Sequence, residues 1–401
     1  MAANNKNIKR DFPIVTTALI GLNVVLYVVT AVISADDRKQ IFEVFGLTAT
    51  SPHLRNMITS SFLHDNWFHL AINMFFLWLF GRTIERAIGA APYLLLYISG
   101  GLFAALTHLA IVHAFMPDVG WRPSLGASGA IAGVLGVYAV RYSRNKLDIL
   151  GVGIRPPVLL LAWLLLQIFL GVLSLYVTNE QLKRVDYWAH IGGFIFGIVL
   201  AQLTNMATTG RKEYLLSDAQ MSLKRGTLLD VARKYEALLR YDEQDPFTNA
   251  ELGRTWAFLE DEEQAVPYYE AAINLYVKAG GGDEAEARYR ELHHLLPKAT
   301  LKPDTLYHLG CLMEEQGRHS CAVSALAKIC HLHPDAAERE MATLKIGQIQ
   351  LNHLKRPDLA AVTLEQFISQ YPDSEWKHFA GQLLQTARHP ESIRDTDGKE
   401  G

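Results

Sequence analysis

Cysteine is scarce in this chain, and its three cysteines, Cys311, Cys321 and Cys330, all lie in the second half. An odd number of cysteines without metal-like spacing gives neither a disulfide framework nor a metal motif. This suits a reducing compartment, and we interpret the three cysteines as small buried residues. We expect no metal and no cofactor. We also expect no cleavable signal peptide, because the apolar run before the small residues 31–34 is long enough to span a membrane.

Charge is also scarce up to Gly210, where 15 lysines and arginines stand against 10 acidic residues. The rest of the chain holds 23 against 31 and is therefore acidic. The first part instead carries apolar runs near the ~20 residues that a transmembrane helix needs. These differences predict an all-α fold, with a membrane domain to about residue 205 and a water-soluble domain after it. No nucleic-acid partner is expected.

Six membrane-spanning helices are predicted in the first part, at residues 14–33, 64–80, 92–115, 128–142, 157–177 and 187–203. Six spans place both termini on the same side of the bilayer. The loops on that side hold eleven lysines and arginines and the opposite loops hold six, which predicts that both termini are cytoplasmic. Ser128, at the start of the fourth span, then lies toward the outside.

The fourth span is short, since the thirteen residues from Ser128 to Val140 cover only ~20 Å at ~1.5 Å per residue. The hydrocarbon core is ~30 Å thick. Arg141 and Arg144 hold the inner end of the span near the cytoplasmic surface, so Ser128 lies below the outer surface and residues 120–127 dip in above it. Irregular backbone at that depth needs protein or a water-filled cavity around it. The sequence therefore predicts a wet pocket with a serine at its floor.

A serine between glycines opens this span, with Gly126 and Gly129 on either side of Ser128. The N-terminus of a helix favours negative charge, and glycine lets another group approach closely. The pattern is typical of a nucleophile. Membrane helices also use such small residues simply to pack against one another.

His190 starts the sixth span, and Gly193 and Gly197 follow it with the four-residue spacing of a helix-packing face. Gly129 begins a similar face in the fourth span. Two such faces let helix backbones nearly touch, which would bring His190 beside Ser128. A neutral imidazole in that position is able to take the hydroxyl proton as a general base.

The second span offers three polar side chains, His64, His69 and Asn73. His69 and Asn73 are four residues apart and share a helix face. Both could donate hydrogen bonds to a developing oxyanion, together with the backbone N–H of Ser128. His64 lies five residues before His69, roughly 140° around the helix, and we interpret it as structural.

Other interpretations of the polar residues stay open. Asn73 is also typical of a contact between helices. Asp186, four residues before His190, either orients that histidine as a triad acid or caps the sixth helix. We interpret His108 and His113 as interfacial groups.

Together these motifs resemble the rhomboid family of intramembrane serine proteases, over roughly residues 10–205. The residues that carry the resemblance are His64-x4-His69-x3-Asn73, Gly126-x-Ser128-Gly129 and Ala189-His190-x2-Gly193-x3-Gly197, with Arg55 and Glu85 as further family-like positions.

The resemblance implies Ser128 as nucleophile and His190 as general base, a dyad without an acid. It implies an oxyanion hole made by His69, Asn73 and the Ser128 amide. It further implies structural roles near the site for His64, Gly126, Gly129, Gly193 and Gly197. Substrates of the family are transmembrane helices cleaved near the outer surface of the membrane.

One position departs from the family pattern. Some relatives have an aromatic residue four positions after the serine, which stacks on the catalytic histidine, whereas this chain has Ala132. This leaves a water molecule or Asp186 to orient His190.

The second half repeats a helix–turn–helix pattern. Gly253, Gly310 and Gly347 each follow a leucine or isoleucine and are followed twelve or thirteen residues later by an alanine. The spacing resembles tetratricopeptide repeats, with an earlier half-unit at 232–246 and a degenerate unit at 284–297. Such arrays present a concave surface to peptides or protein partners, and a helical domain without a partner groove is the alternative.

Two histidine pairs in this half, His293-His294 and His331-x-His333, are interpreted as solvated surface residues rather than metal ligands.

We expect a cytoplasmic N-terminal segment (1–13), a six-span catalytic domain (14–205), a linker (206–225), a cytoplasmic repeat domain (226–390) and a disordered tail (391–401). The predicted function is an intramembrane serine endopeptidase in the lipid bilayer of a bacterial inner membrane. It would cleave transmembrane protein substrates and use its repeats to recruit a substrate or a cytoplasmic protein or peptide. The alternative is a non-proteolytic rhomboid-like adaptor that binds transmembrane helices, although intact Ser128 and His190 argue against it.

Overall fold

The computed structural model describes residues 12–144, 147–149, 152–176 and 185–389. The described chain divides into two compact units, and the boundary between them in the sequence lies between Arg211 and Lys212. The expected tail and most of the expected N-terminal segment lie outside the described residues, so these two expectations stay predictions.

The first unit, the membrane unit, is a bundle of apolar helices. Its helical elements are α1 (Ile14–Val32), α2 (Ala35–Phe45), α3 (Leu54–Thr59), η1 (Ser60–Phe62), α4 (Trp67–Phe76), η2 (Leu77–Gly81), α5 (Arg82–Ile88), α6 (Ala90–Phe115), η3 (Pro117–Val119), α7 (Ser128–Arg141), α8 (Pro156–Tyr176) and α9 (Tyr187–Leu203). Strands β1 (Leu147–Ile149) and β2 (Val152–Ile154) form an antiparallel hairpin, the one sheet among the described residues. Apart from this short hairpin, the regular elements of the described chain are helices, so the all-α prediction is confirmed.

Three helices of the described part, α1, α6 and α8, are long and apolar enough to cross a membrane on their own. α9 and the following helix α10 (Met206–Lys224) make a fourth crossing if this bent pair is counted as one. These apolar helices identify a membrane protein. The remaining predicted spans correspond to shorter elements: α7 has 14 residues, as short as the sequence predicts, and the second span is built from α4, η2 and α5.

α7 lies between α6 and α9 and is buried along almost its whole length. Glycines make this contact close. A β-carbon on Gly197 of α9 would overlap the carbonyl oxygen of Gly133, and a β-carbon on Gly133 would lie 3.2 Å from the Cα of Gly100 in α6. The bundle is thus centred on backbone-to-backbone packing, which membrane helices use where small residues meet.

The second span begins later than predicted. Asn66 caps α4 by accepting a hydrogen bond from the His69 backbone N–H at 2.9 Å. The helix therefore starts at Trp67, and His64 lies in the loop before it. The predicted position of His64 on this helix is wrong for that reason.

Below α4 the span contains η2, a π-helical turn, and continues as α5. Glu85 of α5 is buried and accepts hydrogen bonds from the backbone N–H groups of Val15 and Thr16, both at 2.8 Å, and from the Thr16 hydroxyl at 2.7 Å. A carboxylate at a helix N-terminus satisfies N–H groups that have no intrahelical acceptor and interacts favourably with the helix dipole. Glu85 thus fastens the start of α1 to the end of the second span.

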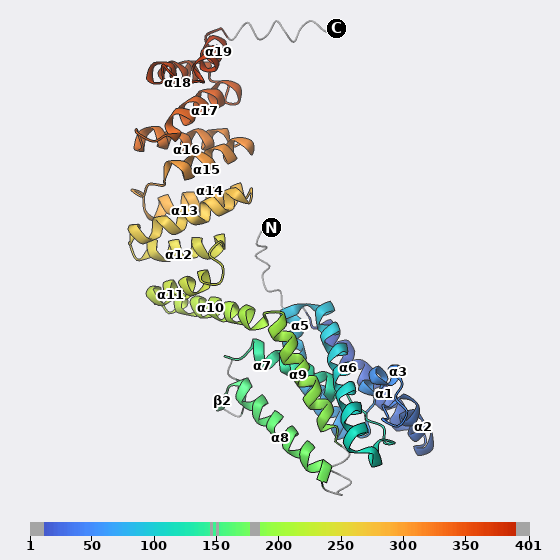
Figure 1. The fold of residues 1–401 in the computed structure, drawn as a ribbon. Helices are drawn as coiled ribbons and strands as arrows, with labels where there is room; N and C mark the ends of the chain where they lie inside the picture. Colours follow the sequence, from blue (N-terminus) through green and yellow to red (C-terminus); the bar gives the residue numbers. More distant parts are fainter. Residues whose placement is uncertain (1–11, 145–146, 150–151, 177–184, 390–401) are drawn as a thin grey trace, which may run out of the picture. The chain divides into compact units, whose positions relative to one another are not determined.

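The second unit, the repeat unit, is a succession of helices that stack one after another (Figure 1). After α10, which occupies the expected linker, its helices are α11 (Leu228–Leu239), α12 (Pro246–Phe258), α13 (Glu262–Lys278), α14 (Gly282–Leu295), α15 (Pro303–Glu315), α16 (His319–Leu332), α17 (Glu338–Asn352), α18 (Pro357–Gln370) and α19 (Lys377–Arg388).

The repeat glycines lie where paired helices touch. A β-carbon on Gly310 would lie 2.7 Å from Leu326, and one on Gly347 would lie 2.8 Å from Leu364. Gly253 meets the ring of Tyr269 in the same way, at 2.9 Å. The predicted tetratricopeptide-like packing is confirmed by these contacts.

Two smaller expectations for the repeat unit need correction. The three cysteines are free thiols and only half-buried. His293 Nε2 lies 2.9 Å from Lys328 Nζ, and His333 Nε2 lies 2.9 Å from the carbonyl oxygen of Leu301. These two histidines therefore take part in contacts between helices and are not simply solvated, because the repeats bring distant segments against them.

Candidate active site

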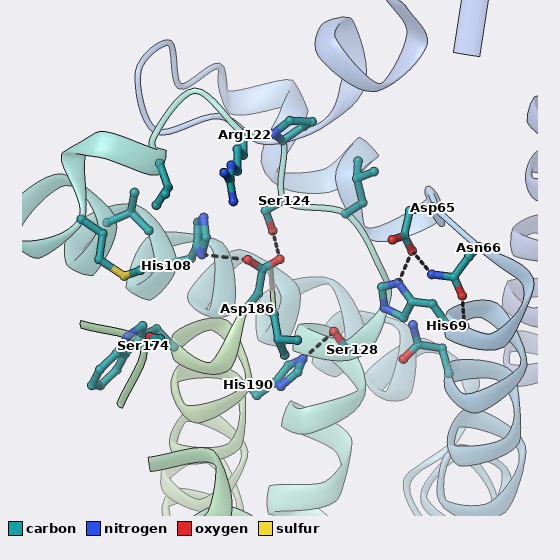
Figure 2. A pocket seen from close by; sticks show the side chains of 18 of the residues that line it. Asp65, Asn66, His69, His108, Arg122, Ser124, Ser128, Ser174, Asp186 and His190 are labelled. Atoms are coloured by element: carbon teal, nitrogen blue, oxygen red, sulfur yellow. Dashed lines mark hydrogen bonds and ion pairs between the residues drawn. The ribbon is translucent and has the colours of Figure 1, made fainter. Parts of the chain in front are cut away.

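Ser128 is the first residue of α7, and His190 lies in the first turn of α9. Ser128 Oγ lies 2.7 Å from His190 Nε2, although 62 residues separate them in the chain. Figure 2 shows the two side chains pointing at each other. This is a hydrogen-bond distance, and it is the geometry of a hydroxyl beside a base that is able to take its proton.

Small residues around the Ser128–His190 pair allow this approach. A β-carbon on Gly129 would lie 2.6 Å from Ala104 Cβ of α6, and one on Gly193 would overlap the carbonyl oxygen of Gly129. Any larger residue at either position would push α7 away from a neighbouring helix. The absence of a side chain at Gly129 and Gly193 therefore helps to set the distance between the Ser128 hydroxyl and the His190 imidazole.

A cavity of about 650 Å³ opens beside the pair, and both side chains lie on its wall. Its lining comes from the start of the second span, from α6 and α8, from the loop before α7 and from the start of α9. The pocket that the short fourth span predicts is therefore present, with Ser128 on its wall.

α4 presents His69 and Asn73 to the same cavity. Gly126 packs against both, since a β-carbon there would lie 2.7 Å from the His69 ring and 3.5 Å from Asn73 Nδ2. Its φ of 122° is also a conformation that glycine adopts without strain. The loop before α7 thus needs glycine at position 126, because the backbone has a positive φ and because a side chain would collide with His69.

Each of the two α4 side chains has a supporting partner. His69 Nδ1 lies 2.9 Å from the Asp65 carboxylate, and this hydrogen bond lowers the pKa of Asp65. Asn73 Nδ2 donates to Nε2 of the buried His64 at 3.0 Å. An amide has two N–H donors, so one hydrogen of Asn73 is committed to His64 and the second is available to a group in the cavity.

Asp186 occupies a different place from either predicted one. Its side chain makes no cap for α9. Oδ2 accepts a hydrogen bond from Ser124 Oγ at 2.5 Å, and Oδ1 lies 3.4 Å from His108 Nδ1 (Figure 2). The predicted roles as triad acid and as helix cap are therefore both wrong, because the loop before α7 provides a closer partner. His108 is buried on the cavity wall, whereas His113 is exposed, and the interpretation of both as interfacial groups stays a prediction.

Gln167 of α8 is the side chain that sequence reasoning missed. Its Oε1 lies 2.8 Å from His190 Nδ1. Trp163, one turn earlier on α8, places its ring 6.1 Å from the His190 ring. The available signal was a lone amide within a long apolar run, since polar residues inside membrane segments are functional hypotheses by default.

The chemical inventory of the cavity is a hydroxyl, an imidazole and several hydrogen-bond donors. Within the described ranges, no three His, Cys, Asp or Glu side chains gather as metal ligands would. A hydroxyl with a base, and donors beside it, are the groups that acyl transfer requires.

Two family models match parts of this chain. Residues 51–206 match the family model described as "Rhomboid domain", and residues 304–336 and 341–374 match the one described as "Tetratricopeptide repeat".

Several characterised proteins resemble the first half of the chain. "Rhomboid protein 1, mitochondrial" of Saccharomyces cerevisiae is 32% identical over 41% of this chain and 46% of its own length. "Presenilin-associated rhomboid-like protein A, mitochondrial" of Danio rerio is 32% identical over 35% of each chain. "Rhomboid protease GluP" of Bacillus subtilis is 28% identical over 49% of this chain and 36% of its own length. The chain thus spans less than half the length of each of these relatives.

Among solved structures, the one described as "Crystal structure of MamA protein" has a TM-score of 0.24 and 16% identity, over 40% of this chain and 92% of that chain. So low a score carries no structural argument.

Proposed function

Residues 51–206 belong to the rhomboid family, and from that premise we propose that the chain is an intramembrane serine endopeptidase. Its substrates are transmembrane helices of other membrane proteins, cut near the outer face of the membrane. The observation that carries the proposal is the 2.7 Å contact between Ser128 Oγ and His190 Nε2 on the wall of one cavity. A relative in Bacillus subtilis that is named a rhomboid protease adds support.

The proposed reaction begins with the hydrogen bond of the pair. His190 Nε2 takes the hydroxyl proton while Ser128 Oγ attacks the scissile carbonyl carbon, which forms a tetrahedral intermediate. The imidazolium then gives this proton to the leaving amine as the C–N bond breaks. Water, deprotonated by the same imidazole, hydrolyses the acyl-enzyme and regenerates the serine.

The negative charge of the intermediate needs donors that are already in place. Ser128 lies at the N-terminus of α7, where backbone N–H groups have no intrahelical acceptor. His69 and the second amide hydrogen of Asn73 lie on the same cavity. We assign the oxyanion hole to these groups, with His64 holding Asn73 in place through their 3.0 Å hydrogen bond.

A fluorophosphonate probe tests the proposed nucleophile directly. The wild-type protein should be labelled at Ser128, whereas Ser128→Ala should lose the label and should cleave no member of a panel of tagged single-span proteins. Ser99→Ala is the matched control, because this half-buried serine of α6 donates to carbonyl oxygens of its own helix, those of Leu95 and Leu96, and does not line the cavity. Cleavage by the purified Ser128→Ala protein would contradict the proposal.

The rival function is a non-proteolytic adaptor that binds transmembrane helices. An adaptor has no need of a hydroxyl 2.7 Å from an imidazole. Absence of labelling in the wild type, together with retained capture of single-span proteins, would favour the adaptor.

The repeat unit is proposed to recruit the substrate, or a cytoplasmic protein or peptide. Tetratricopeptide repeats imply a protein interaction, and linked binding sites raise the local concentration of a partner. Pull-down from cell extract with wild type and with a variant that lacks the repeats tests this role.

We further propose a bacterial inner-membrane location with both termini in the cytoplasm. The support for this orientation is the excess of lysine and arginine in one set of loops, eleven against six, and a relative from Bacillus subtilis supports the bacterial location. Reporter fusions after residue 205 and in the loop 116–127 test the orientation, since only the latter should report an extracytoplasmic position.

A further inference from the structure

Gln167 lies in the middle of the buried face of α8. The buried residues of this helix with helical spacing are Leu160, Gln167, Gly171 and Ser174. Other positions of α8, such as Leu165 and Phe169, expose large apolar side chains. A polar side chain in a membrane helix is costly unless it has a partner, so the partner of Gln167 defines what the residue does.

That partner is His190. Gln167 Oε1 lies 2.8 Å from His190 Nδ1, and His190 Nε2 lies 2.7 Å from Ser128 Oγ. An amide oxygen only accepts hydrogen bonds. The hydrogen of the neutral ring is therefore on Nδ1, which leaves the lone pair of Nε2 directed at the hydroxyl of Ser128.

We propose that Gln167 is a positioning residue that fixes the tautomer and the orientation of His190. This inference rests on the proposed function and adds a residue to it. α8 also supplies Trp163, whose ring centroid is 6.1 Å from that of His190. Trp163 and Gln167 are four residues apart and share a helix face. The His190 ring therefore has two neighbours on α8, the ring of Trp163 and the acceptor oxygen of Gln167.

Two features of the chain explain why this support comes from α8. The residue four positions after the serine is Ala132, which has no ring to stack on His190. Asp186 is bound to Ser124 and His108. An amide also orients the ring without a buried carboxylate, whose desolvation among apolar helices would be costly.

A purely structural role would be different, since the amide would then only join α8 to α9. Such a role changes stability but not the position of the ring hydrogen. The tautomer of His190 therefore separates positioning from packing.

The experiment compares full-length wild type with Gln167→Met, which keeps the length of the side chain but removes the acceptor. Gln167→Glu keeps an acceptor oxygen in the same place. Gln202→Met is the matched control, because Gln202 is an exposed residue near the end of α9. The measurements are kcat and KM for a transmembrane model substrate, and the ¹⁵N shifts of His190, assigned by their loss in His190→Ala.

Gln167→Met should lower kcat about tenfold with KM unchanged, the order expected for one lost hydrogen bond. Its His190 should shift from the Nδ1–H form toward a mixture of tautomers. Gln167→Glu should restore kcat, and Gln202→Met should match the wild type in both measurements.

Unchanged kcat and tautomer in Gln167→Met would overturn the inference, and so would a lower kcat with an unchanged tautomer. If Gln167→Met does not fold, an inactive but folded Gln167→Glu overturns it. If the wild type neither cleaves nor reacts with fluorophosphonate, the proposed function fails. The ¹⁵N shifts alone then decide whether Gln167 fixes the ring.

Discussion

Asp186 accepts a hydrogen bond from the Ser124 hydroxyl at 2.5 Å, and the segment that carries Ser124 runs directly into Gly126 and Ser128. The Ser124 backbone is itself held, since its N–H donates to the Leu47 carbonyl oxygen at 2.8 Å. Asp186 immediately precedes α9, which carries His190. The Ser124–Asp186 hydrogen bond therefore joins the two segments that bear the Ser128–His190 pair.

The first prediction concerns the Ser124–Asp186 hydrogen bond. Ser124→Ala and Asp186→Ala should each slow fluorophosphonate labelling about tenfold, since a charged hydrogen bond is lost at the entry to α7. The double variant should be no slower than Asp186→Ala alone, because that variant already removes the Ser124 hydrogen bond together with the Asp186–His108 contact. Losses that add would show that the two residues act separately.

The second prediction concerns Asn73. Asn73→Ala should lower kcat by up to ~10²–10³, with KM little changed, if its amide is a principal donor to the oxyanion. The measurement is steady-state cleavage of a transmembrane model substrate. Asn23→Ala is the matched control, because Asn23 is another buried membrane asparagine and bonds the Leu19 carbonyl of its own helix. An unchanged kcat would reassign Asn73 to helix packing.

The third prediction concerns the glycine contact between α7 and α9. Gly197→Ala should destabilise the protein by ~1–3 kcal/mol, the usual cost of overpacking a tight contact. Gly21→Ala in α1 meets no atom within 4 Å and should be neutral or slightly stabilising. Thermal midpoints in one detergent give the comparison. Equal midpoints for the two variants would contradict the packing described for α9.

The fourth prediction concerns the division between the two units. Truncation after Arg211 removes the repeat unit and keeps every residue of the Ser128–His190 cavity. The truncated protein should therefore cleave a generic substrate at a rate similar to wild type, and should cleave its natural substrate poorly in cells. A folded truncated protein that is inert toward all substrates would show that the repeats act on the catalytic unit itself.

The fifth prediction concerns pH and the repeat unit. Burial, and next the nearby charge of Lys328, lower the pKa of His293 below its ordinary value of 6.5. The folded state prefers the neutral ring, so the stabilisation that His293 gives is fully present above pH 6.5 and is lost as the pH falls from 6.5 through the lower pKa of the folded state.

Hydrogen exchange of α14 and α16, corrected for intrinsic rates, should therefore show less protection at pH 5.5 than at pH 7.5. His293→Gln should reduce this difference, because glutamine keeps an acceptor for Lys328 without titrating. The exposed His294→Gln on the same helix is the control. A difference that His293→Gln leaves unchanged would assign the pH effect to other groups.

The large features of this protein were predictable because they repeat or because they are long. Apolar runs located the membrane helices, and glycine–alanine spacing located the repeats. The short fourth span predicted a cavity at Ser128, since ~20 Å of helix does not fill a ~30 Å core. These arguments need only length, composition and spacing.

The partners of single side chains were harder to predict. Asp186 had two plausible local roles, and its actual partner Ser124 comes from a loop 62 residues earlier. Gln167 is one amide in an apolar helix, and its distance to His190 depends on how α8 packs against α9. His64 was misplaced because Asn66, a residue type that favours N-caps, was not used to start the helix. Long-range contacts and caps therefore account for what the sequence reading missed.

The π-helical turn η2 affects which way the two ends of the second span face. Asn73 and Glu85 are twelve residues apart, which in a uniform α-helix would turn their side chains about 120° away from each other. The π-helical turn Leu77–Gly81, with its i→i+5 hydrogen bonds, rotates less per residue than an α-helix and so reduces this angle. At one end of this span Asn73 faces the cavity, and at the other end Glu85 faces the start of α1. The five residues of η2 therefore lie between the end of the span that lines the cavity through Asn73 and the end that Glu85 fastens to α1.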